Sequence, residues 1–187
     1  MNFENAVGFV HSILRSTLQG GDVAVDATIG NGWDTALMAE LVGENGVVYG
    51  FDIQPVALEV TRVRTENASA DVKLFLHGHE NMDAHIASEH RGRVKAVTFN
   101  LGYLPGGDKD ITTQAESTIS GLEQARDLLA PRGIITVVCY RHAEGEKELN
   151  VVRDLLSTWP QKNYTAVESA FINQHSLPPV VFTVQTH

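Results

Sequence analysis

The stretch Asp-Val-Ala-Val-Asp-Ala-Thr-Ile-Gly-Asn-Gly-Trp-Asp-Thr, residues 22–35, decides the fold. Its first half is a short apolar run of the length that forms a buried strand. In its second half, Gly30 and Gly32 let the backbone turn sharply and come close to a ligand. Since a helix is expected over residues 34–42, the stretch predicts a strand, a glycine-rich turn and a helix in succession.

The same alternation continues along the chain. Strands are predicted at residues 22–27, 46–52, 72–77, 95–100, 134–140, 164–172 and 180–186. Helices are predicted at residues 3–18, 34–42, 55–67, 113–130 and 144–159, with a weaker helical segment at 81–89. This spacing is typical of a parallel α/β sheet covered by helices on both faces. The last two strands are joined by a link too short for a parallel crossover, so they should form an antiparallel hairpin.

We therefore expect one domain over residues 1–187, in which an N-terminal helix within residues 1–20 packs on a seven-stranded sheet. Pro131-Arg132-Gly133 is expected to end the helix that precedes the fifth strand.

The composition, 43% hydrophobic and 20% charged, is that of a globular protein. No apolar run is long enough to span a membrane, and the first residues lack the basic start of a secretory signal. The single Cys139 excludes an intrachain disulfide and a cysteine-cluster metal site, which fits a reducing cytosol. These features predict a cytoplasmic protein that holds no metal and does not enter a membrane.

The charge balance bears on nucleic-acid binding. The chain has 14 Lys and Arg against 23 Asp and Glu, a formal net charge of -9 with neutral His. This balance argues against a general nucleic-acid coat, whose domain would usually be basic. The charge balance does not exclude an enzyme that binds RNA through one local basic patch.

Ligands of open α/β sheets bind beyond the carboxyl ends of the strands. After the second strand stands Asp52, whose carboxylate can accept both hydroxyls of a ribose or, alternatively, cap the helix that begins at Pro55. After the third strand stand His79 and Glu80, which could contact an adenine edge. Glu80 could equally be an acid stabilised by a helix N-terminus.

The residues after the glycines separate two classes of nucleotide-binding enzyme. Thr35 stands where a dinucleotide fingerprint has its third small residue, and Asp34 would lie beside the expected pyrophosphate. A carboxylate is a poor match for a pyrophosphate but a good one for the cationic sulfonium and amino group of S-adenosylmethionine. An NAD-binding oxidoreductase is therefore disfavoured but stays open, as does a non-catalytic cofactor-binding module.

The chain resembles a known family at specific motifs. Residues 26–35, Asp52, the run Asn-Leu-Gly-Tyr-Leu-Pro-Gly-Gly-Asp-Lys at 100–109 and Phe-Ile-Asn-Gln at 171–174 together resemble small class I methyltransferases long labelled rRNA methylases. Some members methylate 5-aminomethyl-2-thiouridine at the wobble position of tRNA. The resemblance extends from about residue 22 to residue 184. It implies a Rossmann-like class I fold and S-adenosylmethionine as methyl donor, with S-adenosylhomocysteine as product.

The resemblance also implies roles for individual residues. Gly30, Asn31 and Asp34 would line the methionine part of the cofactor, Asp52 and Gln54 the ribose and adenine, and His79 and Glu80 the adenine, while Asn100 would lie beside the sulfonium. The predicted cofactor contacts are Gly30, Asn31, Asp34, Thr35, Asp52, Gln54, His79, Glu80 and Asn100.

Asn100-Leu101-Gly102-Tyr103 resembles the Asn/Asp-Pro-Pro-Tyr motif of amino methyltransferases, with Leu and Gly in place of the two prolines. We expect Asn100 to orient the amine and Tyr103 to contact the substrate. Asp108 could accept a proton and Lys109 could bind an RNA phosphate, or both could belong to a solvated turn. The other predicted substrate contacts are His142, Asn173 and Gln174, for which plain surface or turn positions are the alternative.

The sequence thus predicts a methyltransferase that acts on the aminomethyl group of a tRNA wobble uridine. Methylation of rRNA or of a small amine is the nearest alternative, and the net charge of -9 slightly favours a small substrate. A homodimer is expected as one way for a small domain to present enough surface to tRNA.

Overall fold

The computed structural model describes residues 4–102, 113–141, 143–175 and 177–187. Its strands are β1 (Val23–Asp26), β2 (Val47–Asp52), β3 (Asp71–Leu76), β4 (Val94–Leu101), β5 (Leu129–Cys139), β6 (Tyr164–Ser169) and β7 (Val180–Thr186). They form one sheet in the order β3-β2-β1-β4-β5-β7-β6. The first five strands are parallel, and β7 runs antiparallel to both β5 and β6. The seven-stranded sheet with a terminal antiparallel hairpin is confirmed.

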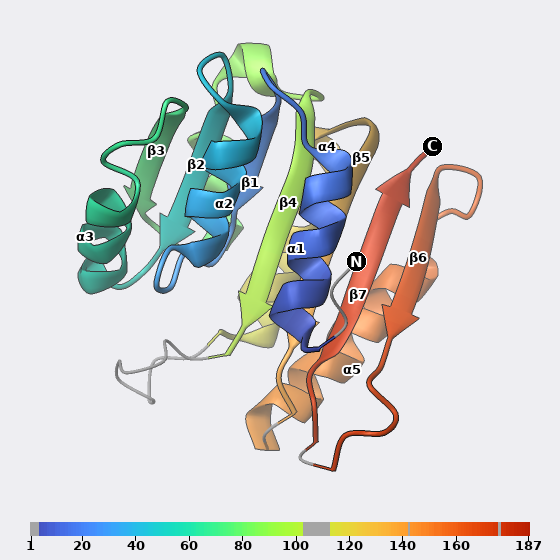
Figure 1. Ribbon diagram of the computed structural model, residues 1–187. Coiled ribbons are helices and arrows are strands. Elements are labelled where there is room, and N and C mark those ends of the chain that lie inside the picture. The colour runs from blue at the N-terminus through green and yellow to red at the C-terminus, as the bar shows by residue number, and fades with distance from the viewer. Residues whose placement is uncertain (1–3, 103–112, 142, 176) are drawn as a thin grey trace.

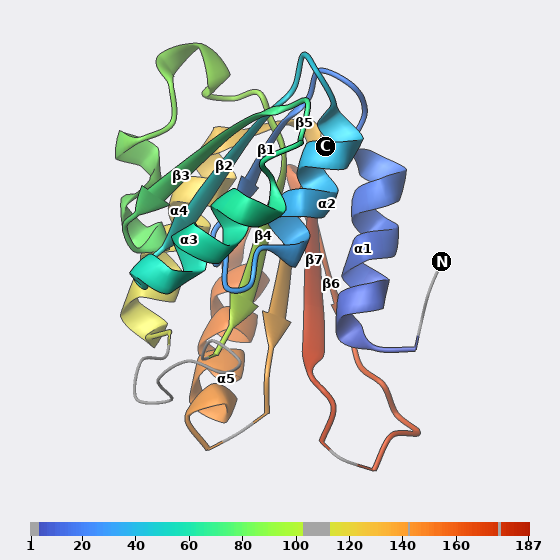
Figure 2. The same ribbon diagram turned by 60° about the vertical axis from the view of Figure 1, so that its left-hand side comes forward.

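Helices cover both faces of this sheet. They are α1 (Ala6–Thr17), α2 (Trp33–Val42), α3 (Pro55–Arg64), α4 (Ala115–Leu128) and α5 (Ala143–Thr158). Figure 1 shows α1 and α2 in front of the sheet and α4 and α5 behind it, and Figure 2 shows α1 beside α2. Among the described helices, none is both long and apolar enough to cross a membrane.

The buried strands explain why the apolar runs do not alternate with polar residues. In β1, Ala24 packs in the cluster under α1 and α2, whereas Val23 and Val25 pack in the cluster under α4 and α5. A parallel strand with helices on both faces needs apolar side chains on both. The sheet therefore separates two hydrophobic cores.

Two segments differ from the sequence prediction. The residues 131–133 that should end a helix lie inside β5, which begins at Leu129 because Leu129 pairs with Val94. The register then shifts before Ile134, and the Thr186 hydroxyl donates to the Ala130 carbonyl in the shifted part (2.8 Å). The weak helix predicted at 81–89 is two short 3₁₀ helices, η1 (His79–Ala84) and η2 (Ser88–His90).

Candidate active site

A cavity of about 680 Å³ opens at the carboxyl ends of β1, β2 and β4. This volume lies in the usual range for small-molecule sites. Its walls come from the turn after β1, the ends of β2 and β4, the start of η1 and the start of α4. The cavity is therefore at the edge of the sheet where the sequence predicted a ligand.

Asp52 is held at the cavity wall by two backbone groups. Its Oδ2 accepts a hydrogen bond from the Gly30 nitrogen and its Oδ1 one from the Gln54 nitrogen, both 2.9 Å long. The Gly30 backbone has a φ of 53°, a left-handed conformation that glycine adopts without strain. Because each carboxylate oxygen has two lone pairs, the Asp52 carboxylate can still accept both hydroxyls of a ribose.

Asp34, almost completely buried, joins three elements. His11 Nε2 of α1 lies 2.5 Å from Asp34 Oδ1, and the Asn100 Nδ2 of β4 donates to Asp34 Oδ2 at 2.6 Å. Asp34 itself belongs to the first turn of α2. Sequence reasoning missed His11, because 23 residues separate it from Asp34 and no spacing rule links them.

A second carboxylate, Asp26, is fully buried behind Asp34. It accepts hydrogen bonds from the Thr35 hydroxyl (2.6 Å) and the Thr28 nitrogen (3.2 Å). Burial, followed by the nearby Asp34 charge, raises the pKa of Asp26 from 3.8 to about 7. Thr35, one of the predicted cofactor contacts, is completely buried and is not part of the cavity wall, because its hydroxyl is directed to Asp26.

His79 and Glu80 both line the cavity, as do Gly30, Asn31, Gln54 and Asn100. The His79 ring is 6% exposed, bonds to the Ala27 backbone and lies edge-on to Phe99. Burial lowers the pKa of His79, so its ring is neutral. Its Nε2 has no partner among the described residues. A polar atom left unpaired beside a cavity is suited to bind a polar group of a ligand.

The rim of the cavity carries an exposed aromatic residue that the sequence analysis did not single out. Trp33 is 62% exposed, and the Arg64 guanidinium lies over its ring at 3.3 Å from the centroid. The Arg64 Nε donates to the Asn31 carbonyl at 2.8 Å, so the same guanidinium also fixes the glycine-rich turn. Tyr140 also lines the cavity. Burial, followed by the charge of Asp34, raises the pKa of its hydroxyl.

Other predicted substrate contacts are not brought to the cavity. Asn173 and Gln174 are exposed in the link between β6 and β7, and the Gln174 side chain donates to the Glu4 carbonyl at 3.3 Å. Tyr103, Asp108, Lys109 and His142 lie outside the described residues.

Gly102 and Thr113 lie side by side at the cavity. The Gly102 nitrogen donates to the Thr113 hydroxyl (3.0 Å), which in turn donates to the buried Glu148 (2.7 Å). A second hydrogen bond, from the Thr113 nitrogen to the Gly102 carbonyl (3.1 Å), also joins these two residues. Gly102 and Thr113 both line the cavity.

Residues 48–185 match the family model described as "Putative rRNA methylase". The chain is 37% identical to the chloroplastic tRNA (mnm(5)s(2)U34)-methyltransferase of Arabidopsis thaliana, over 96% of this chain and 69% of the relative. It is 42% identical to the solved structure of a "putative rRNA-methylase" from Clostridium thermocellum, covering both chains completely with a TM-score of 0.93. A "putative methyltransferase" from Streptococcus mutans, solved in complex with SAH (S-adenosylhomocysteine), is 28% identical over the full length of both chains, with a TM-score of 0.88.

The cavity residues fit S-adenosylmethionine. Asp52 has free lone pairs for the ribose, His79 and Glu80 line the same cavity, and the Asp34 carboxylate suits a cationic sulfonium and amino group. Within the described part of the chain, no group of His, Cys, Asp or Glu side chains is arranged to hold a metal ion. The chain therefore belongs to the family described as "Putative rRNA methylase", and it is a class I methyltransferase that uses S-adenosylmethionine.

Proposed function

We propose that this enzyme methylates the amine of 5-aminomethyl-2-thiouridine at the wobble position of tRNA, giving the 5-methylaminomethyl form. The similarity to the Arabidopsis tRNA methyltransferase, at 37% identity over nearly the whole chain, carries this proposal. The polar group at the end of β4 supports it, because Asn100 presents a carboxamide at the cavity wall with its nitrogen fixed by Asp34.

The chemistry requires a neutral amine. A free alkylamine has a pKa near ~10.4 and is mostly protonated at neutral pH, so it has no lone pair for attack. Burial in the cavity favours the neutral form, and the Asn100 carboxamide oxygen can accept one N–H hydrogen and so direct the lone pair. The amine nitrogen then bonds to the methyl carbon in line with the carbon–sulfur bond. That bond breaks with its electron pair staying on sulfur, and the nitrogen releases one proton.

The substrate of this enzyme is tested by nucleoside mass spectrometry. The purified enzyme and S-adenosylmethionine are incubated separately with the tRNA and rRNA fractions of cells that lack the gene. We expect the mass of 5-aminomethyl-2-thiouridine from tRNA to rise by one CH₂ group, with no change in the rRNA nucleosides. The Asn100→Ala protein, shown to bind S-adenosylhomocysteine, is the matched control and should give no product.

Two other outcomes would overturn the proposed substrate. A mass increase confined to rRNA would make the enzyme an rRNA methyltransferase. No increase in either fraction, with cofactor binding intact, would favour a small amine as the acceptor. We further propose that the enzyme acts in the cytoplasm as a homodimer, and light scattering at the assay concentration tests the oligomeric state.

A further inference from the structure

We propose that His11 is a positioning residue for methyl transfer: through Asp34 it fixes the Asn100 carboxamide at the cavity wall. The inference rests on the proposed role of Asn100 in receiving the substrate amine. His11 bonds to one oxygen of the Asp34 carboxylate and Asn100 bonds to the other, at 2.5 and 2.6 Å. Both contacts join a nitrogen to a carboxylate oxygen, and hydrogen bonds to a carboxylate are among the strong ones in proteins.

The direction of these hydrogen bonds settles how Asn100 is turned. An ionised carboxylate only accepts hydrogen bonds, so the His11 Nε2 and the Asn100 Nδ2 must both be donors. With its nitrogen committed to Asp34, Asn100 has its carboxamide oxygen left to accept an N–H of the substrate. A carboxamide rotated by half a turn would present N–H groups to the amine and oppose the alignment of its lone pair.

Helix α1 gives His11 a rigid support. Ala6, Val10 and Leu14 are buried against the sheet, which fixes α1 beside α2. Val7, one helical turn before His11, lines the cavity itself. In both Figure 1 and Figure 2, α1 runs alongside α2, so His11 reaches the first turn of α2 from the neighbouring helix.

Without His11, the Asp34 Oδ1 loses its hydrogen-bond donor from α1. Asp34 is 7% exposed, so its carboxylate would have to find a new partner or turn toward the cavity. Either movement releases the Asn100 nitrogen. The expected defect is therefore in the alignment of the reacting groups and not in the binding of the methyl acceptor.

Three substitutions separate positioning from a structural role. Glutamine places an amide nitrogen near the position of the histidine Nε2, whereas asparagine is too short to reach Asp34. We expect His11→Ala and His11→Asn to lower kcat about ten- to a hundredfold, the cost of a misplaced reacting group. His11→Gln should keep most of the wild-type kcat. For all three, the KM of the methyl acceptor should stay near the wild-type value.

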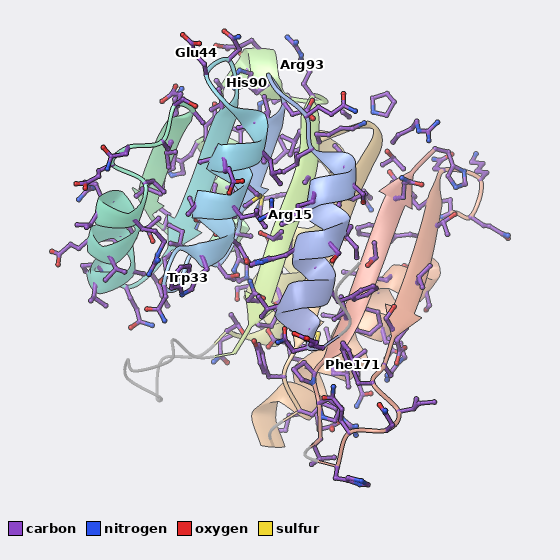
Figure 3. All side chains as sticks on the ribbon, viewed as in Figure 1. Arg15, Trp33, Glu44, His90, Arg93 and Phe171 are labelled. Atoms are coloured by element: carbon purple, nitrogen blue, oxygen red, sulfur yellow. The ribbon has the colours of Figure 1, made fainter. Side chains whose placement is uncertain are left out.

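His90→Ala is the matched control. The His90 Nδ1 also has one side-chain hydrogen bond, to the Tyr49 hydroxyl at 2.8 Å, but it lies at the opposite end of the sheet from Trp33 and the cavity rim (Figure 3). This variant should lose stability without a change in kcat. A thermal melt of each variant shows whether it is folded at the assay temperature.

Equal kcat values for His11→Asn and His11→Gln would overturn the inference, as would a rise in KM with unchanged kcat. A crystal structure of His11→Asn provides a test that does not depend on the acceptor. We expect the Asn100 Nδ2 and Asp34 Oδ2 atoms to leave hydrogen-bond range there. If this contact persists, His11 does not position Asn100. If the wild-type enzyme leaves tRNA unmethylated, the proposed substrate fails while this structural test still decides the role of His11.

Discussion

At the scale of single residues, Asp52 is the clearest test of the cofactor site. Asp52→Ala removes the acceptors for the ribose hydroxyls and also the hydrogen bonds that hold the Gly30 and Gln54 nitrogens. Hydrogen bonds to a charged group contribute about 1.5–3 kcal/mol, so S-adenosylhomocysteine should bind more weakly by that amount. Isothermal titration calorimetry measures the change, and Asp52→Asn, which keeps one acceptor oxygen, should give a smaller loss. An unchanged affinity in the alanine variant would remove Asp52 from the site.

The site residues that could be predicted from the sequence are those at or shortly after the carboxyl end of a strand. Gly30, Asp52, His79 and Asn100 all line the cavity, because parallel strands end at one edge of the sheet. His11 could not be predicted in this way, since its contact with Asp34 depends on how α1 crosses the sheet. Thr35 follows the same glycine-rich turn but does not line the cavity, because its hydroxyl bonds to the buried Asp26.

At the scale of secondary-structure elements, the turn between β1 and α2 tolerates no side chain at Gly32. Gly32 has a φ of 74°, and a Cβ there would lie 2.3 Å from the Thr61 Oγ1 of α3. The left-handed conformation alone costs an alanine about 1–2 kcal/mol. Because Thr61 is completely buried and cannot move freely, we expect Gly32→Ala to lower the free energy of unfolding by more than about 2 kcal/mol.

Gly92→Ala separates the cost of the left-handed backbone from the cost of the clash with Thr61. Gly92 also has a positive φ, of 70°, but a Cβ there would meet nothing within 4 Å. Urea denaturation of both variants should show a clearly larger loss for Gly32→Ala, with weaker cofactor binding as well. Equal losses would mean that α3 moves aside at little cost and that the contact between α2 and α3 does not fix the turn.

The elements themselves were predictable where one local signal dominates. Buried apolar runs and helical periodicity predicted all seven strands and the five long helices. The start of β5 was not predictable, because Pro131 and Gly133 signal a break in the chain. The pairing of Leu129 with Val94 and the hydrogen bonds of Thr186 keep this segment in the sheet despite that signal. Such pairing joins residues far apart in the sequence, which no local pattern reports.

At the scale of the whole molecule, the site limits stability. The buried polar groups Asp26, Asp34 and Thr35 lie together at the junction of β1 and α2, between the two hydrophobic cores. Burial, and after it the nearby charge of Asp34, disfavours the ionised form of Asp26, and the raised pKa of Asp26 expresses that cost. The stability of the folded chain should therefore depend on pH through Asp26.

Asp26→Asn tests this dependence. The pKa of Asp26 is about 7 in the folded protein against a reference value of 3.8, so between these values the folded state holds a proton that the unfolded chain has released. The contribution of Asp26 to the free energy of unfolding therefore falls as the pH rises through that window, and it stays constant at higher pH. The asparagine variant loses part of the bonding to Thr35 and Thr28 at every pH but has no such fall.

We expect the difference in unfolding free energy, wild type minus Asp26→Asn, to decrease between about pH 4 and about pH 7 in urea denaturation. A difference that is constant or grows with pH would show that Asp26 is ionised throughout. It would then act as a second negative charge behind Asp34, and the neighbouring sulfonium of the methyl donor would be stabilised by both carboxylates.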